Sequence, residues 1–206
     1  MHIIFEGPDG AGKSTLVNAL LSKLTDKKVM LAQQPGTTEL GKQLRAILKG
    51  PLPMHPMTRQ AMHMADTSEF NACITSLSSQ YDYIIQDRTS FISSPIYGKA
   101  ERGTCDYHID WYKHVITHQA DKLFIILSKK AEEQTRTRGE GDHFDRKDTS
   151  FHQAVYQEYV KFATDPDYAV YTDLIVNRTN LHIIYNDGTI DEAIAQIASI
   201  LELDLK

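Results

Sequence analysis

A glycine-rich segment close to the start of the chain carries the residue types best suited to chemistry. The stretch GPDGAGKST at residues 7–15 fits the pattern G-x-x-x-x-G-K-[ST] and directly follows the apolar run IIF. Glycines allow consecutive backbone N–H groups to converge on phosphate oxygens, and the start of the following helix adds its positive dipole end. The segment therefore predicts a phosphate site built from Gly7, Asp9, Gly10, Ala11, Gly12, Lys13, Ser14 and Thr15.

Two side chains of this segment have specific expected roles toward a nucleoside triphosphate. Lys13 is expected to reach the outer phosphates, and the Ser14 hydroxyl is expected to ligand Mg²⁺. Asp87, which follows another apolar run, is a candidate for supporting the same Mg²⁺ through water. The alternative interpretations are a glycine-rich turn that binds no ligand and an Asp9 side chain that only caps the loop or its helix.

Arginines elsewhere in the chain are suited to hold a second substrate that carries phosphate. Arg45 and Arg88 are predicted to bind an acceptor phosphate, because guanidinium groups match the geometry of phosphate oxygens. Arg136 and Arg138 lie in a polar segment at 136–149, and they are candidates to close over the transferring group. The plainer alternatives are surface ion pairs for Arg45 and Arg88 and a solvated connection for the polar segment.

Five short apolar runs alternate with helical patterns, and these elements must position the residues named above. The runs lie at 2–6, 28–33, 83–86, 122–127 and 181–185. Their alternation with helices predicts an α/β fold with a five-stranded parallel sheet covered on both faces. Helices are predicted after the glycine-rich segment, at about 40–48, at about 58–79, and after a capping box formed by Thr189 and Glu192. Ligands of such a sheet bind beyond the carboxyl ends of its strands.

Length and composition limit the classes of protein that remain. At 206 residues the chain predicts a single domain, with the polar segment at about 136–149 as a short lid. The net charge of −5 argues against a broad cationic surface for nucleic acid. The apolar runs are too short to span a membrane, no cleavable leader is recognised, and Cys73 and Cys105 show no metal or redox spacing. We therefore expect a cytoplasmic protein that acts on small molecules.

Along nearly its whole length the chain resembles the thymidylate kinase family of P-loop nucleoside monophosphate kinases. Three features are similar to signatures of that family: the phosphate segment with Asp9 inside it, the sequence PGTTELG followed by Arg45, and the pair Asp87-Arg88. Residues 136–146 resemble the lid of the family. The resemblance implies the P-loop kinase fold.

The resemblance also implies a reaction, in which the γ-phosphoryl group of ATP, with Mg²⁺, passes to dTMP to give dTDP. Carried over by position, it implies that Asp9 contacts the sugar or phosphate region of the acceptor and that Arg45 and Arg88 bind its 5′-phosphate. The lid arginines resemble those of the subgroup that supplies its catalytic cation from the lid, and dimers are common in the family, so a homodimer is expected. The residues implied in catalysis are Asp9, Lys13, Arg88, Arg136 and Arg138.

Several positions that usually contact thymine in this family are changed in this chain. His63 aligns with the phenylalanine that usually stacks on the base, and Thr67 aligns with the arginine that usually hydrogen-bonds it. Ser93 and Tyr97 fall at two further positions where the family usually has other residues. The predicted acceptor-binding residues are Pro35, Arg45, His63, Thr67, Arg88, Ser93 and Tyr97, with the identity of the base left open.

Other functions remain compatible with these residues. The acceptor is open among dTMP, dUMP, a 5-modified dUMP and dCMP. A kinase of free deoxynucleosides would need a general base and fewer cations at the acceptor, so Arg45 and Arg88 argue against it. An ATP-binding regulatory module would retain the phosphate loop without efficient transfer.

Overall fold

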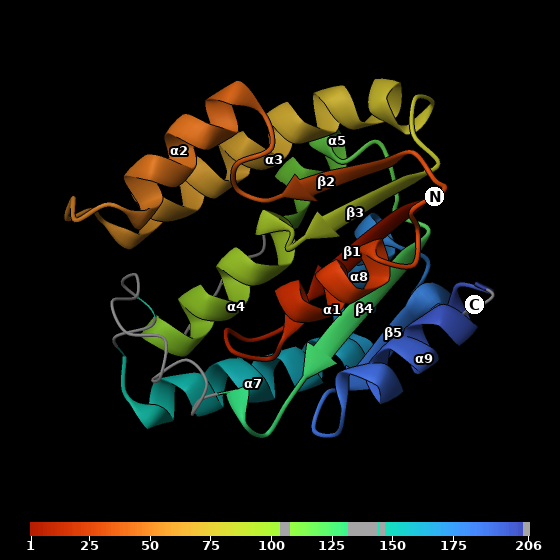
Figure 1. The fold of residues 1–206 in the computed structure, drawn as a ribbon. Helices are drawn as coiled ribbons and strands as arrows, with labels where there is room; N and C mark the ends of the chain where they lie inside the picture. The colour runs from red at the N-terminus through yellow and green to blue at the C-terminus, as the bar shows by residue number, and fades with distance from the viewer. Residues whose placement is uncertain (104–107, 132–143, 145–146, 204–206) are drawn as a thin grey trace.

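A computed structural model of the chain describes residues 1–103, 108–131, 144 and 147–203. Within these residues the centre is a parallel sheet of five strands in the order β2-β3-β1-β4-β5, which confirms the predicted fold (Figure 1). The strands are β1 His2–Glu6, β2 Val29–Gln33, β3 Tyr83–Asp87, β4 Lys122–Leu127 and β5 Leu181–Tyr185. Each strand agrees with a predicted apolar run to within one residue at either end.

Successive side chains of the central strands face opposite sides of the sheet. In β4, Leu123 and Ile125 belong to one hydrophobic cluster, whereas Phe124 and Ile126 belong to the cluster on the other face. All four side chains are fully buried. A strand that is covered on both faces needs apolar residues at every position. This is why the central strands read as continuous apolar runs rather than as alternating ones.

One face of the sheet is covered by two helices, α1 Lys13–Leu21 and α9 Ile190–Ile200, which pack on each other (Figure 1). Leu16 of α1 and Ile197 of α9 are buried in the cluster between these helices and the sheet. The predicted capping box at the start of α9 is confirmed. The Thr189 hydroxyl accepts from the Glu192 N–H, and the Glu192 carboxylate accepts from the Thr189 N–H.

The helices that cover the opposite face were predicted only in part. They are α3 Pro56–Ser78, α4 Ser90–Arg102, α5 Ile109–Val115, α7 Thr149–Thr164 and α8 Ala169–Ile175, with 3₁₀ turns at Pro166–Tyr168 and Arg178–Asn180. α4 packs between α3 and α7 and buries Phe91, Ile92 and Ile96. It also contains Pro95 and has buried residues on most of its sides, so its sequence shows no clear helical periodicity.

All the strands run in the same direction, so the segments that follow them meet at one edge of the sheet. The glycine-rich loop follows β1, and Asp87 ends β3. A turn after β2 leads into α2 Glu39–Lys49, which packs on α3 and begins where the Thr38 hydroxyl accepts from the Gly41 N–H. Among the residues described, no helix has the length and apolar character needed to cross a bilayer.

Candidate functional site

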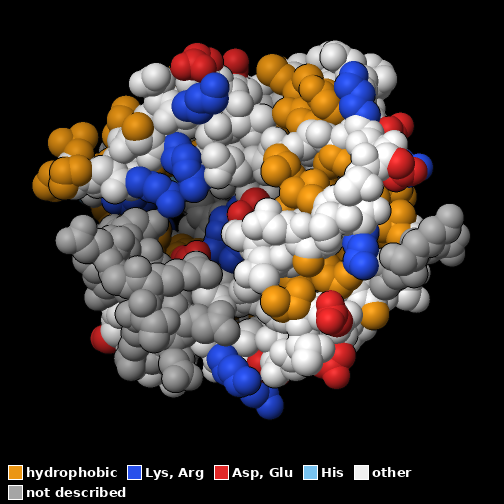
Figure 2. Space-filling view, in the orientation of Figure 1, with side chains coloured by type: hydrophobic (Ala, Val, Ile, Leu, Met, Phe, Trp, Pro, Cys, Tyr) orange, Lys and Arg blue, Asp and Glu red, His pale blue; other side chains and the backbone are white. Residues whose placement is uncertain are grey.

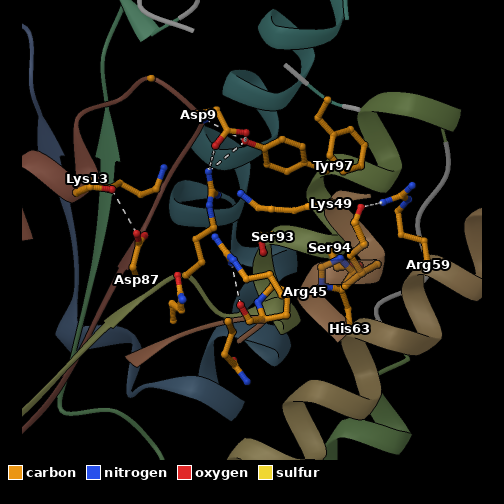
Figure 3. Close-up of a pocket in the computed structure, with 18 of the residues that line it drawn as sticks. Asp9, Lys13, Arg45, Lys49, Arg59, His63, Asp87, Ser93, Ser94 and Tyr97 are labelled. Carbon is orange, nitrogen blue, oxygen red and sulfur yellow. Dashed lines mark hydrogen bonds and ion pairs between the residues drawn. The ribbon is translucent and has the colours of Figure 1, made fainter. Parts of the chain in front are cut away.

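The carboxyl ends of β1, β2 and β3 open onto a cavity of about 240 Å³. Lysine and arginine side chains gather around this hollow in Figure 2, and Figure 3 shows how the side chains of its wall are arranged. The basic residues described in the wall are Lys13, Arg45, Lys49, Arg59 and Arg88, and the acidic ones are Asp9 and Asp87. Such an excess of positive charge attracts and holds anionic ligands.

The loop after β1 approaches its neighbours so closely that glycine is required. Gly7 has φ +141°, and a Cβ atom there would lie 2.1 Å from the carbonyl oxygen of Ile126 in β4. Gly12 adopts a left-handed conformation, with φ 88°, immediately before α1 begins. The side-chain amide of Asn186 donates to the Ala11 carbonyl at 2.9 Å and fastens the loop to the end of β5. The first residues of α1 consequently line the cavity.

Lys13 is buried and lies against the carbonyl groups of the loop that precedes it. Its ammonium group donates to the Gly7 carbonyl at 2.9 Å and to the Pro8 carbonyl at 2.7 Å. Burial, together with the positive charge of Arg88, lowers the pKa of Lys13 from 10.5 to about 8. A phosphate anion beside the ammonium group would favour the charged form and raise this pKa again.

The affinity for the nucleoside triphosphate predicted at this loop is expected to fall as the pH rises above about 8, because the free protein then loses the ammonium form of Lys13. Bound phosphate raises the pKa, so binding in this range takes up a proton, and Kd rises by up to about tenfold per pH unit. Titrations with that triphosphate between about pH 7 and pH 10 measure the effect. Lys13→Arg, which keeps its charge throughout, should show no such fall. An identical fall in that variant would assign the titration to another group.

Arg88 lies at the centre of a network of polar side chains just after β3. Its backbone has φ 67°, which is uncommon for a residue other than glycine, and its side chain is only 17% exposed. Nη1 donates to the Gly7 carbonyl at 2.9 Å and to the Tyr159 hydroxyl at 3.1 Å. Nη2 pairs with the Asp9 carboxylate and lies 3.4 Å from the Tyr97 hydroxyl. These contacts fix the guanidinium group in the wall of the cavity.

Asp9 is ionised as part of this network. Burial opposes its ionisation, but the positive charges of Arg88 and Lys13 outweigh that effect and hold the pKa of the carboxyl below its usual range. The Tyr97 hydroxyl donates to Asp9 at 2.6 Å and accepts from the Asp9 N–H at 2.9 Å. Asp9 therefore fixes both Arg88 and Tyr97, and it is not a simple cap of its loop.

Glu6 supports the same network from beneath, at the end of β1. Its side chain is completely buried and lies 3.7 Å from Nη1 of Arg88. The carboxylate accepts from the Thr89 N–H at 2.6 Å and from the Tyr159 hydroxyl at 2.8 Å. Burial raises the pKa of Glu6, while Arg88 and these hydrogen bonds oppose the rise. The network thus joins β1, β3 and α7 at the base of the cavity.

Arg45 reaches the cavity from α2. It donates to the Pro35 carbonyl at 2.8 Å, in a turn that contains a cis peptide bond between Gln34 and Pro35. Asp66 of α3 holds the same turn by accepting from the Gly36 N–H at 3.1 Å. Burial raises the pKa of Asp66 to about 6. The turn thereby places Arg45 in the same cavity wall as Lys13 and Arg88.

Lys13 and Asp87 lie at one end of the cavity, and Arg59 and His63 lie at the other (Figure 3). Burial and the charge of Arg59 lower the pKa of His63 to about 4, so its ring is neutral near pH 7. Thr67, which was predicted to bind the acceptor, does not line this cavity. Its side chain is fully buried, and its hydroxyl donates to the His63 carbonyl at 3.0 Å within the same helix.

Ser14 and Asp87 bring a hydroxyl and a carboxylate together at the end of the cavity where Lys13 lies. The Ser14 hydroxyl donates to Oδ2 of Asp87 at 3.4 Å. Oδ1 of Asp87 is buried and has no hydrogen-bond partner within the described part of the chain. A carboxylate oxygen and a hydroxyl are hard ligands of the kind that Mg²⁺ prefers, so these residues fit the predicted metal. The described residues contain no cluster of three or more His, Cys, Asp or Glu side chains, so phosphate and water would supply the other ligands.

Most of the predicted site residues meet in this one cavity. Its wall includes Asp9, Gly10, Gly12, Lys13, Ser14, Pro35, Arg45, His63, Asp87, Arg88, Ser93 and Tyr97. Of the other predicted loop residues, Gly7 and Ala11 contribute carbonyl groups to the bonds that hold the loop, and Thr15 is exposed on α1. Arg136 and Arg138, with most of the predicted lid, lie outside the described residues.

Sequence reasoning missed two basic residues of the cavity wall, Lys49 and Arg59. Lys49 ends α2, and Arg59 lies near the start of α3, so neither follows a strand or belongs to a recognised motif. One signal was available in the spacing. Arg59 precedes His63 by four residues, which places the two side chains on the same face of a helix.

Known proteins with similar sequences cover most of this chain. A family model described as thymidylate kinase matches residues 5–178. The thymidylate kinase of Caldicellulosiruptor saccharolyticus is 31% identical over 166 residues, which cover 76% of this chain and 80% of that protein. The thymidylate kinase of Campylobacter jejuni subsp. jejuni is 39% identical over 102 residues, covering 48% of this chain and 50% of that protein.

Solved structures share the fold over nearly the whole chain. The thymidylate kinase of Ehrlichia chaffeensis superposes with a TM-score of 0.71 at 21% identity and covers 98% of both chains. The thymidylate kinase of Candida albicans superposes with a TM-score of 0.73 at 23% identity, covering 98% of this chain and 90% of that one. The fold is therefore that of the P-loop kinases.

Proposed function

The chain belongs to the thymidylate kinase family, and on that basis we propose that it transfers the γ-phosphoryl group of ATP to dTMP, giving dTDP and ADP. As a member of this family it is a phosphotransferase of the nucleoside monophosphate kinase type, with ATP as the phosphate donor. Its substrates are small nucleotides. The choice of dTMP as the acceptor is the specific content of the proposal.

One observation carries the proposal: basic residues from three separate strand ends reach a single cavity. Lys13 comes from the loop after β1, Arg45 from the helix after β2, and Arg88 from the end of β3. Transfer between two nucleotides brings two polyanions together, so positive charge is needed on both sides of the transferred group. A free nucleoside has no 5′-phosphate with which Arg45 and Arg88 would pair.

We assign the donor phosphates to the loop at 7–15, with Lys13 on the outer phosphates. Arg45 and Arg88 bind the 5′-phosphate of the acceptor and hold it in line with the γ-phosphate. Asp9 positions Arg88 through their ion pair. Arg136 and Arg138, outside the described residues, are proposed to close over the transferred group. Ser14 and Asp87 would hold Mg²⁺, which when bound neutralises charge on the donor phosphates.

The base of the acceptor is assigned to the end of the cavity that includes His63. The neutral ring of His63 offers a flat surface on which a base can stack. Ser93 and Tyr97 face the same cavity from α4. Pro35, in the turn after β2, forms the wall beside Arg45.

A steady-state panel tests this function with ATP and Mg²⁺ against dTMP, dUMP, a 5-substituted dUMP, dCMP, the ribonucleoside monophosphates and free thymidine. We expect dTMP to have the highest kcat/KM and thymidine to be inert. A higher kcat/KM for another monophosphate would change the assigned base and keep the reaction. Tight ATP binding without turnover of any member would instead support a regulatory module.

A further inference from the structure

The end of the cavity opposite Lys13 holds a basic residue for which phosphate transfer gives no role. Arg59 lies in the cavity wall beside His63 and Ser94 (Figure 3). The phosphates at the other end already have Lys13, Arg45 and Arg88 as partners in the proposed function. Arg59 is therefore available to a different part of a ligand, and the contacts around it indicate which part.

Contacts on two sides hold the Arg59 guanidinium in place. Nη1 donates to the Leu48 carbonyl at 2.9 Å, near the end of α2. The guanidinium carbon lies 5.7 Å from the centre of the Phe144 ring, within the range of a cation–π contact. Phe144 packs edge-on against Tyr97 at 5.1 Å, so it is fixed in turn by another residue of the wall. A guanidinium has five N–H groups, and the bond to Leu48 uses one of them.

The side chains around Arg59 form a surface that suits a nucleobase. His63 lies one turn further along the same face of α3 and carries a neutral ring. Ser93 and Ser94 add hydroxyl groups from α4. Thr67, one turn beyond His63, points its hydroxyl back into its own helix and contributes nothing to this surface.

We propose that Arg59 recognises the acceptor base by donating hydrogen bonds to the 4-carbonyl oxygen of a pyrimidine. Guanidinium groups only donate, so Arg59 favours a pyrimidine with a 4-carbonyl group over cytosine, whose 4-amino group is itself a donor. This inference rests on the proposed function and deepens it. The family resemblance implied that the residue one turn after the stacking ring, at the position of Thr67, hydrogen-bonds the base. In this protein we assign that hydrogen bond to Arg59, one turn before His63.

The test compares kcat/KM for dTMP, dUMP and dCMP in the wild-type protein and in Arg59→Met, which keeps the length of the side chain and removes its donors. We expect the preference for dTMP and dUMP over dCMP to fall by about tenfold to a hundredfold in the variant. In Arg59→Met, kcat/KM should fall for dTMP and dUMP, while kcat/KM for dCMP changes little. Arg59→Lys keeps the charge and loses the planar array of donors. Its preference for dTMP and dUMP over dCMP should lie between that of the wild type and that of Arg59→Met.

Arg102→Met is the matched control. Arg102 is an exposed arginine that lines a small neighbouring cavity together with Arg59, but it does not line the main cavity. Its removal should leave the base preference unchanged. Because Arg59→Met also loses the bond to Leu48, the Tm and the Kd for ATP are measured for every variant. An unchanged Kd for ATP with a reduced base preference would assign the effect to the acceptor end.

Two outcomes would overturn the inference. One is an unchanged preference in folded Arg59→Met protein, and the other is a wild-type preference for dCMP over dTMP and dUMP. If the wild-type protein phosphorylates no monophosphate at all, the proposed function fails, and this result is distinct from both of the others.

Discussion

Lys13→Ala is expected to lower kcat by on the order of 100- to 1,000-fold, the loss typical of removing one preorganised group that stabilises charge in a transition state. The ammonium group is buried at the start of α1, where a low dielectric strengthens its interaction with phosphate. The loop amides and the helix dipole remain in the variant and still bind the ground state of ATP. KM for ATP should therefore rise much less than kcat falls. Steady-state and single-turnover rates measure the two effects.

The same substitution at an exposed lysine separates lost chemistry from general damage. Lys23 lies just after α1 and is exposed, so Lys23→Ala should retain turnover within about twofold, as surface substitutions usually do. Lys13 also bonds the Gly7 and Pro8 carbonyls, so the Tm of Lys13→Ala has to be recorded. Turnover close to the wild-type value in a folded Lys13→Ala protein would remove Lys13 from the donor site.

Arg88→Met is expected to lower the free energy of unfolding as well as the use of the acceptor. Glu6 is completely buried beside Arg88, and Asp9 pairs with the same guanidinium. Removing one partner of a buried ion pair leaves an uncompensated charge, which costs about 3–5 kcal/mol. In the variant Glu6 binds a proton more readily, and protonation removes its uncompensated charge. Urea denaturation should therefore show a smaller decrease in the free energy of unfolding, relative to the wild type, at about pH 5 than at about pH 8.

A double variant separates stability from binding at this position. Adding Glu6→Gln to Arg88→Met removes the buried charge of Glu6 and leaves that of Asp9, so it should restore part of the stability. KM for the monophosphate should stay raised in the double variant, while the Kd for ATP stays near the wild-type value. Equal weakening of both substrates, or recovery of acceptor use together with stability, would contradict the assignment of Arg88 to the acceptor phosphate.

The centre of the sheet could be predicted because its inner strands are covered on both faces. Residues such as Leu123 and Phe124, which face opposite clusters, make the run in β4 apolar from Leu123 to Leu127. The capping box of α9 was equally readable, because it depends on two residues three positions apart. α4 could not be predicted in the same way, since Pro95 and burial on most sides remove the usual periodicity.

The candidate site was predictable where it follows strands and not where it depends on helix orientation. The loop at 7–15 and Arg88 are fixed by the ends of β1 and β3. Thr67 was expected in the cavity, but it is fully buried, and Arg59 from the same helix lies in the wall. The bonds that Arg88 makes to Asp9 and Tyr159 join residues 79 and 71 positions away, which local patterns do not report.

One oxygen atom, the Gly7 carbonyl, accepts hydrogen bonds from both Lys13 and Arg88, each at 2.9 Å. A triphosphate that draws Lys13 away leaves this oxygen to Arg88, and a monophosphate that draws Arg88 away leaves it to Lys13. If the two nucleotides bind as proposed, we expect that filling either half of the cavity alters the free energy of filling the other, and thermodynamic linkage makes that influence equal in both directions. On the proposed assignment, the Gly7 carbonyl is thus a contact through which the two halves of the cavity influence each other.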